Sequence, residues 1–389
     1  MKVPQIFDRN MKRLAFLDNA VSVGYSLEIN SLWTATFTLP ADDDKNAYCQ
    51  PLNFVEIFDG DERIDLFRII GEDLERSNGA TRFYDCEHVL ATLLSDVLFQ
   101  YHQYGGGGIK TADVLNYVLA QQTTRKWVLG DCDFKRYFEY NWENSTLLAA
   151  LFAVPECFDS EYMWTWDTTV YPWTISLVAP SDTMKSEVRY AKNMTSMKKT
   201  VDASGIANRI YALGYGEGVN QLTIAGVNGG KPYVEDAMSI QQYGLCSTIL
   251  VDSRYEVAEN LKGYAEQMLA ELKNPYVSYE IGAIDLHRLT GDTFSKFRPG
   301  EIVRVVDEAD GINLRTRIVS VEKSDAQGDP GSVTVTIANK SKDIAGSISE
   351  LQNRALINET YAQGATNQQI YNFTDNADAT HPATLKLYI

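Results

Sequence analysis

Short alternating segments in the last third of the chain most constrain its fold. Residues 298–307, 317–322 and 333–340 alternate apolar and polar side chains, and each segment is closed by a turn. A period of two residues places the apolar side chains on one face of a β-strand. Together with the similar segment 208–218, these strands predict a small β-barrel.

The start of the chain predicts a second set of strands. Residues 21–29 and 33–39 alternate on either side of a short turn, and Pro40 ends the pair, as expected of a β-hairpin. Three further strands and one helix are predicted at 54–58, 66–72, 81–86 and 87–99. This opening region therefore also predicts a β-barrel.

The middle of the chain mixes helices and strands. Gly105–Gly108 is a run of glycines, which predicts a linker because glycine leaves the backbone most freedom. Apolar residues at helical spacing predict helices at 111–122 and 145–152. Apolar residues at the same spacing predict a further helix at 257–272, which starts at the capping box Ser253–Glu256. This helix is expected to belong to an inserted α/β segment.

A stripe of tryptophans, Trp164, Trp166 and Trp173, lies in two predicted strands of this middle region. Aromatic side chains dominate cores and interfaces, so we interpret the stripe as packing. Aromatic rings also bind sugars, which leaves a sugar-binding adhesin open as an alternative function.

The end of the sequence changes character. Residues 346–372 predict a long polar helix with a thin apolar stripe, a type that packs on a neighbouring chain. Residues 373–389 are loop-like and then begin a β-strand. An unpaired strand is not a stable terminus, so we expect this sequence to be a fragment or only the ordered part of its protein.

Charge and hydropathy exclude two classes of partner. The formal net charge is −17, and such a chain repels phosphate backbones, so we expect no tight nucleic-acid binding. No run of about 18 apolar residues is present, so the sequence predicts no membrane span.

The residues that carry chemistry form no recognisable motif. The four histidines, His88, His102, His287 and His381, occur in no HExxH sequence, and the five cysteines show no CxxC pair. We therefore predict no catalytic, cofactor-binding or metal-binding residues and no enzymatic activity. A triad assembled only by the fold, or a glycosidase pair among the 52 acidic residues, stays open.

The order and the amino-acid patterns of these segments resemble those of the N-terminal hub region of long-tailed phage tail-tip proteins, the prophage endopeptidase-tail or tail-associated lysin family. The segments that carry the resemblance are the opening barrel, the strand at 208–218 and the closing strands, which end in Asn339-Lys340-Ser341. The family is similar in fold to the central baseplate hub protein of T-even phages.

The resemblance implies a structural virion protein of the tail tip, made in the cytoplasm of a bacterial host. Three copies would form a ring that joins the sixfold tail tube or distal tail protein to a threefold tip and surrounds or closes the DNA channel. The implied partners are copies of the same chain, the distal tail protein, the tail tube or tape-measure protein, and a downstream fibre or receptor-binding module. A cell-wall hydrolase carried by the tail tip is the other alternative.

On this basis we predict an α+β, mainly β chain with two β-barrel tube domains, two additional α/β domains and a C-terminal helix. The expected domains are a first tube domain (1–104), an α/β domain (105–196), a second tube domain (197–235 and 298–345), an inserted α/β domain (236–297), a linker helix (346–372) and the start of a downstream β module (373–389).

Overall fold

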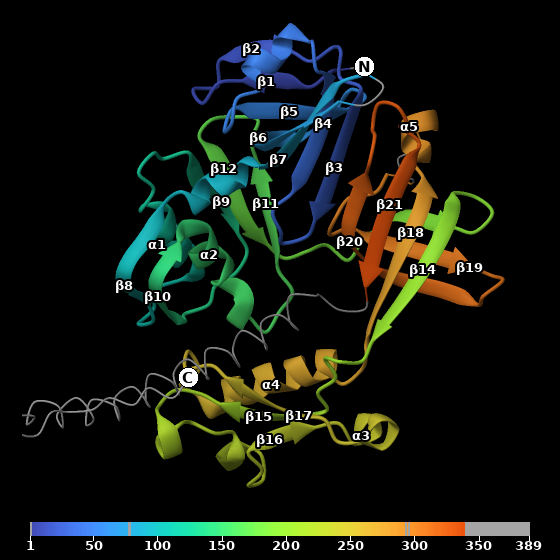
Figure 1. Ribbon diagram of the computed structural model, residues 1–389. Helices are drawn as coiled ribbons and strands as arrows, with labels where there is room; N and C mark the ends of the chain where they lie inside the picture. Colours follow the sequence, from blue (N-terminus) through green and yellow to red (C-terminus); the bar gives the residue numbers. More distant parts are fainter. Residues whose placement is uncertain (1, 77–78, 292–293, 295, 339–389) are drawn as a thin grey trace, which may run out of the picture. The chain divides into compact units, whose positions relative to one another are not determined.

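The computed structural model describes residues 2–76, 79–291, 294 and 296–338 (Figure 1). Strands predominate over helices, which confirms the predicted α+β, mainly β class. The chain divides into two compact units. The large unit contains the chain up to Ser204 and again from Pro275, and the small unit is Gly205–Asn274.

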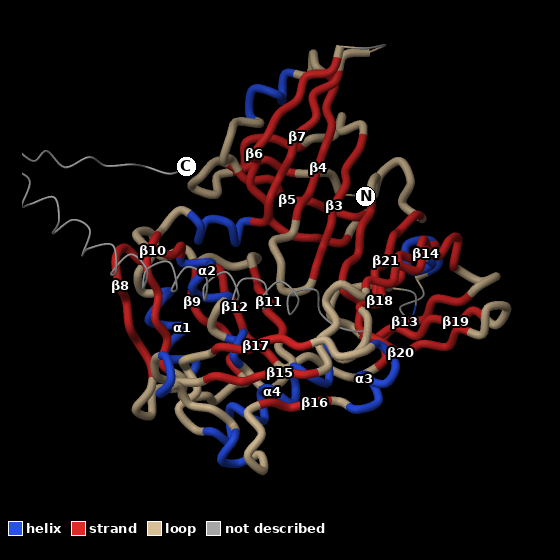
Figure 2. Tube along the Cα trace, turned by 60° about the horizontal axis from the view of Figure 1, so that its bottom comes forward, coloured by secondary structure: helices blue, strands red, loops and turns tan. Residues whose placement is uncertain are grey.

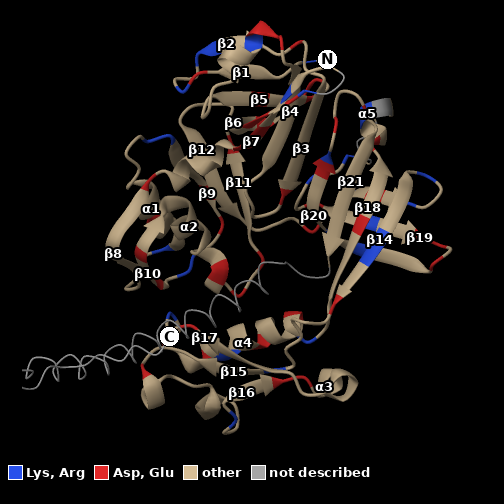
Figure 3. Cartoon of the chain, in the orientation of Figure 1, with Lys and Arg blue, Asp and Glu red and all other residues tan. Residues whose placement is uncertain are grey.

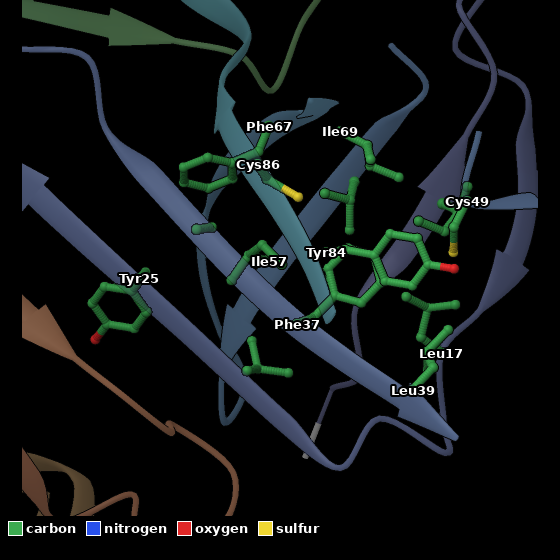
Figure 4. Packing of buried hydrophobic residues seen from close by; sticks show 14 of the residues in the cluster. Leu17, Tyr25, Phe37, Leu39, Cys49, Ile57, Phe67, Ile69, Tyr84 and Cys86 are labelled. Atoms are coloured by element: carbon green, nitrogen blue, oxygen red, sulfur yellow. The ribbon is translucent and has the colours of Figure 1, made fainter. Parts of the chain in front are cut away.

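The first half of the large unit is a set of seven strands around one apolar core. Its β3 (Ser22–Glu28) and β4 (Thr34–Pro40) pair antiparallel, which confirms the predicted hairpin. Phe37 stacks on Tyr84 in the core at a ring separation of 4.7 Å (Figure 4). The other strands are β1 (Gln5–Phe7), β2 (Arg13–Phe16), β5 (Phe54–Asp59), β6 (Glu62–Glu75) and β7 (Thr81–His88).

The second half of the large unit has its own core, in which Ile281, Val321 and Val335 are buried. The closing strands predicted from the sequence are present as β19, β20 and β21. The elements of this half are β13 (Met184–Arg189), β14 (Met194–Asp202), β18 (Tyr276–Ile284), α5 (Leu286–Thr290), β19 (Ile302–Asp307), β20 (Ile312–Lys323) and β21 (Ser332–Ala338).

Strand β20 joins the two halves into one sheet. Its first part pairs with β19, its later part pairs with β21, and its last residues pair with β3, where Glu322 lies opposite Ser26. Thirteen of the described strands form one sheet, and their pairing closes no barrel. The two predicted barrels are therefore two halves of one open sheet, because the 12 residues of β20 are long enough to pair with both.

Two smaller sheets and two helices form an α/β region within the large unit. Helices α1 (Thr111–Leu119) and α2 (Leu147–Phe152) confirm the two predicted helices. The strands are β8 (Val97–Gly105) with β10 (Glu139–Thr146), and β9 (Trp127–Cys132) with β11 (Met163–Asp167) and β12 (Trp173–Val178).

Two features at the start of this region differ from the prediction. The helix expected over 87–99 is only a short 3-10 helix at Val89–Leu94. Strand β8 begins soon after it and pairs with β10 in a two-stranded ribbon, so the domain boundary expected at residue 104 falls inside this β8–β10 ribbon. Gly105–Gly108 forms a tight turn in which all four residues have positive φ, rather than a linker between domains. A Cβ at Gly105 would lie 2.2 Å from the carbonyl oxygen of Phe138, so this turn requires glycine.

The small unit is a three-stranded sheet with a helix against it. Helix α4 (Ala258–Leu272) packs on the sheet where Ile210 and Leu250 are buried, and it confirms the predicted helix. The N-cap residue of α4 is Val257, and the predicted capping box Ser253–Glu256 lies before the helix. The other elements are β15 (Arg209–Leu213), β16 (Tyr233–Glu235), α3 (Ala237–Tyr243) and β17 (Ser247–Val251).

The strands at the borders of the small unit also differ from the prediction. The sequence places the segment 208–218 in the second barrel, whereas β15 pairs with β16 and β17. It places 276–286 in the insert, whereas β18 pairs with β14 on one edge and β21 on the other. Alternation identifies both segments as strands, but it carries no information about the sheet that each one joins.

The C-terminal predictions, a helix at 346–372 and a β module at 373–389, lie outside the described residues, as does the end of the second barrel segment, 339–345. None of the helices that the structure describes is both long and apolar enough to cross a bilayer.

Candidate functional site

One face of the large sheet is polar across both halves. Residues that alternate with the core positions line up in cross-strand rows, because neighbouring strands pair residue by residue. We call two of these rows the polar face. The first row, from β14 to β6, contains Ser196, Gly282, Thr334, Glu322, Ser26, Thr34, Glu87 and Arg68. The second row, from β14 to β3, contains Lys198, Glu280, Thr336, Ser320 and Glu28.

The two cations of the polar face are each paired with a carboxylate. Arg68 Nε donates to Glu87 Oε1 at 2.6 Å, and Lys198 Nζ lies 3.7 Å from Glu280 Oε2. Figure 3 shows a basic segment of β14 in blue beside an acidic segment of β18 in red. Glu28 and Glu322 add further negative charge to the two rows. The face therefore offers hydroxyl and carboxylate groups, and it offers no excess of cations to phosphate.

A buried group of ion pairs, which we call the seam cluster, fastens the two halves together. Lys323, only 2% exposed, lies with Nζ 2.7 Å from both Asp59 Oδ2 and Asp285 Oδ2. Arg288 Nε also donates to Asp59 Oδ1 at 3.2 Å. The Tyr25 hydroxyl donates to Asp59 at 3.1 Å, and burial together with this carboxylate raises the pKa of Tyr25 well above its ordinary value.

The seam cluster connects elements that are far apart in sequence. Tyr25 and Asp59 come from β3 and β5 of the first half, whereas Asp285, Arg288 and Lys323 come from the second half. A buried ion pair stabilises a contact only when each charge keeps its partner, so the cluster makes the register of β20 against β3 specific. No sequence motif marks these residues, because their pairing depends on the sheet order.

Trp164 and Trp173 of the predicted stripe are packed inside the protein, and Trp166 is half-buried. Trp164 is 3% exposed and stacks on Phe152 at a ring separation of 5.3 Å, and Trp173 is 1% exposed. Trp166 packs edge-on against Trp33 at 4.7 Å. The packing interpretation is confirmed for Trp164 and Trp173, and a sugar ring has no access to the faces of these two side chains.

His88 is the histidine that comes nearest to a catalytic arrangement, because its Nε2 lies 3.4 Å from Asp65 Oδ2. Its side chain is completely buried, its Nδ1 accepts the Leu90 backbone N–H at 3.1 Å, and its ring packs against Trp166 at 4.8 Å. A general base must reach a proton of the substrate, and His88 cannot reach solvent. The pair therefore fits a structural role.

The other two histidines that the structure describes have different surroundings. His102 is bonded to the hydroxyl of Tyr117 at 2.8 Å, and His287 lies beside the seam cluster in a cavity of about 470 Å³. His381 lies outside the described residues. Within 2–76, 79–291, 294 and 296–338, no group of three or more His, Cys, Asp or Glu residues could hold a metal ion.

The buried Asp65 carboxylate predicts a specific sensitivity to acid. Burial opposes its ionisation, but His88 and Arg63 outweigh that effect and hold the pKa of Asp65 below its ordinary value of about 3.9. Its ionised form therefore stabilises the fold above that pH, and the contribution is lost as the pH falls through the lower folded-state pKa.

We expect Asp65→Asn to lower the free energy of unfolding near neutral pH by about 1–3 kcal/mol and to flatten the loss of stability below about pH 4. Urea unfolding at a series of pH values measures both effects. The exposed Asp131→Asn is the control. An acid dependence as steep as that of the unmodified chain would contradict this role of Asp65.

Comparison with protein families identifies two matching segments. The model of the prophage endopeptidase tail matches residues 181–348, and the model of a prophage endopeptidase tail domain matches residues 106–172. No curated protein matches the chain.

Several solved structures share the fold. Prophage tail protein gp18 from Listeria monocytogenes superposes with a TM-score of 0.61 at 14% identity, over 91% of this chain and 99% of that chain. A tail protein from Neisseria meningitidis gives 0.61 at 12% identity over 87% and 96%. A 43 kDa tail protein of prophage MuSo2 from Shewanella oneidensis gives 0.58 at 14% identity over 88% and 98%.

The two family models together match more than half of the sequence, and the tail-protein fold extends over most of the chain. Over these two segments the chain belongs to the prophage endopeptidase tail family, and its fold is that of prophage tail proteins.

Proposed function

We propose that three copies of this chain form a ring around the DNA channel of a phage tail tip, with the polar face as the channel wall. The observation that carries the proposal is the continuity of this face across both halves of the sheet, from Ser196 on β14 to Thr34 on β4. A wall that belongs to one hydrogen-bonded sheet has no internal gap where the two halves meet.

The division of the large sheet suits a change of symmetry. Each chain carries two β halves with separate cores, so three chains would present six halves around one axis. Heterologous contacts close into a ring when the rotation between copies fits. Such a ring can meet a sixfold tail tube or distal tail protein on one side and a threefold tip on the other.

The chemistry of the polar face suits the passage of DNA. Each lysine or arginine that contacts a phosphate releases counterions and adds affinity, which would slow movement along the channel. Lys198 and Arg68 already have carboxylate partners, and the other side chains of the two rows are hydroxyl-bearing, acidic or absent. DNA would therefore pass this wall without being held.

The proposed partners follow from the position of such a ring. Two further copies complete it, the distal tail protein and the tail tube or tape-measure protein lie on one side, and a downstream fibre or receptor-binding module lies on the other. The protein acts in the virion after its synthesis in the bacterial cytoplasm. The ring either surrounds the DNA or closes the channel until ejection.

The proposal assigns no catalytic activity to this chain. We expect the purified 389-residue protein to release no soluble fragments from peptidoglycan, since His88 is buried and Trp164 and Trp173 offer no sugar-binding surface. A reducing-sugar and free-amine assay of the digest measures this. Turnover that disappears in His88→Ala but persists in the control variant His102→Ala, at a half-buried position, would favour the cell-wall hydrolase instead.

The mass of the protein in solution tests the assembly. Light scattering across a range of concentrations should give a species of about three times 43.6 kDa for this chain alone, or a larger complex with three copies of it when the distal tail protein is added. A single species of 43.6 kDa under all of these conditions would argue against the ring.

A further inference from the structure

Lys323 is a buried nucleophile held between two carboxylates of the seam cluster. Its Nζ donates to Asp59 Oδ2 and to Asp285 Oδ2 at 2.7 Å each, and to the carbonyl oxygen of Pro330 at 3.0 Å. A nitrogen 2.7 Å from a carboxylate oxygen lies about 3.5 Å from the carboxyl carbon, which is the separation of a near-attack geometry. An amine and a carboxyl group in this position can condense to an amide.

The two carboxylates differ in the groups that surround them. Asp59 Oδ1 accepts a hydrogen bond from Arg288 Nε at 3.2 Å, and Asp59 Oδ2 accepts one from the Tyr25 hydroxyl at 3.1 Å. These donors stabilise the negative charge that attack by an amine at the Asp59 carboxyl carbon would place on its oxygens. Asp285 Oδ1 accepts the Arg288 backbone N–H at 3.0 Å, which holds the Asp285 side chain in place beside Lys323. Asp59 is therefore the better electrophile and Asp285 the better proton acceptor.

We propose that Lys323 and Asp59 form an intramolecular isopeptide bond, for which the ion pairs of the seam cluster are the reactant state. A proton passes from Lys323 Nζ to Asp285, and the neutral amine attacks Asp59 Cγ. The Nζ–Cγ bond forms and the Cγ–Oδ2 bond breaks. The oxygen leaves as water with two of the three ammonium protons, one of them returned by Asp285. The amide nitrogen keeps the third proton, so the step needs no oxidant and no further reactant.

The surroundings of the cluster suit this condensation. Lys323 is 2% exposed and Asp59 is 7% exposed, so bulk water has little access to hydrolyse the amide. Well-oriented groups within one molecule reach effective concentrations of about 10⁵–10⁸ M, which favours closure. The cluster also lines the cavity of about 470 Å³, which has room for the released water. The bond would link β5 to β20, which are not neighbours in the sheet, and would join the two halves covalently.

Mass spectrometry of the full-length chain under denaturing conditions tests the bond. The mass should be lower than the sequence mass by one water molecule, and a tryptic digest should contain two peptides joined through Lys323 and Asp59. Lys323→Met and Asp285→Asn should each have their full sequence mass, since the first lacks the amine and the second lacks the proton acceptor. Asp285→Asn keeps the shape of the cluster, so it tests the bond even where Lys323→Met does not fold. The control Lys198→Ala, whose side chain is 74% exposed, should still lack one water.

Three results decide the matter. A loss of water in the parent chain that is absent from both cluster variants, together with the joined peptides, supports the bond. A folded parent chain with its full sequence mass overturns it. A loss of water without joined peptides, or one that persists in Lys323→Met, also overturns it. Asp59 precedes Gly60, and an aspartyl–glycine pair can lose water alone by forming a succinimide.

Discussion

Replacement of Lys323 with alanine should lower the free energy of unfolding of the large unit by about 3–5 kcal/mol. The change leaves Asp59 and Asp285 buried without the ammonium group that lies 2.7 Å from each of them. It also removes a hydrogen bond of 3.0 Å to the carbonyl oxygen of Pro330. An unpaired charge inside a protein costs far more than the loss of a surface ion pair.

Tryptophan fluorescence during urea unfolding measures this effect for the large unit alone. All six tryptophans lie outside the small unit, which is Gly205–Asn274. Lys198→Ala is the matched control, because that side chain is 74% exposed and should change the free energy of unfolding by less than about 0.5 kcal/mol. A Lys323→Ala protein as stable as this control would show that the seam cluster does not join the two halves.

The second large effect is expected from lysines placed on the polar face. Ser320→Lys, Thr334→Lys and Thr336→Lys in one chain would add nine cations to a trimeric channel wall. We expect the ring to assemble normally, to bind duplex DNA with an affinity that falls steeply as salt is raised, and to slow DNA ejection from assembled particles.

A matched variant separates the channel wall from net charge. Thr124→Lys, Ser181→Lys and Thr183→Lys add the same charge at exposed positions outside the polar face. They should leave ejection unchanged. Equal retardation by both triple variants would contradict the assignment of the polar face to the channel and would attribute the effect to overall charge.

The sequence predicts the strands of this protein better than it predicts their partners. Alternation in 21–29 and 33–39 identifies the β3–β4 hairpin, because its two strands are adjacent in sequence and share one turn. The same alternation identifies β15 and β18 as strands, but the sheets predicted for these two strands are wrong. Pairing between distant strands depends on the whole topology, which local periodicity does not encode.

The residues of the candidate site also could not be grouped from the sequence alone. The glutamates, serines and threonines of the polar face are ordinary surface residues in the sequence, and they form rows only once the order of the strands is known. The seam cluster has no signal either, since Asp59 and Lys323 are 264 residues apart. The tryptophan stripe, by contrast, could be interpreted from composition, because large aromatic side chains are usually buried.

A reconstruction of the assembled ring by electron cryo-microscopy tests the central claim most directly. The account predicts a threefold particle in which the rows from Ser196 to Thr34 and from Lys198 to Glu28 face the channel. A ring with this face turned outward, or a channel wall formed mainly by unpaired arginines and lysines, would contradict it.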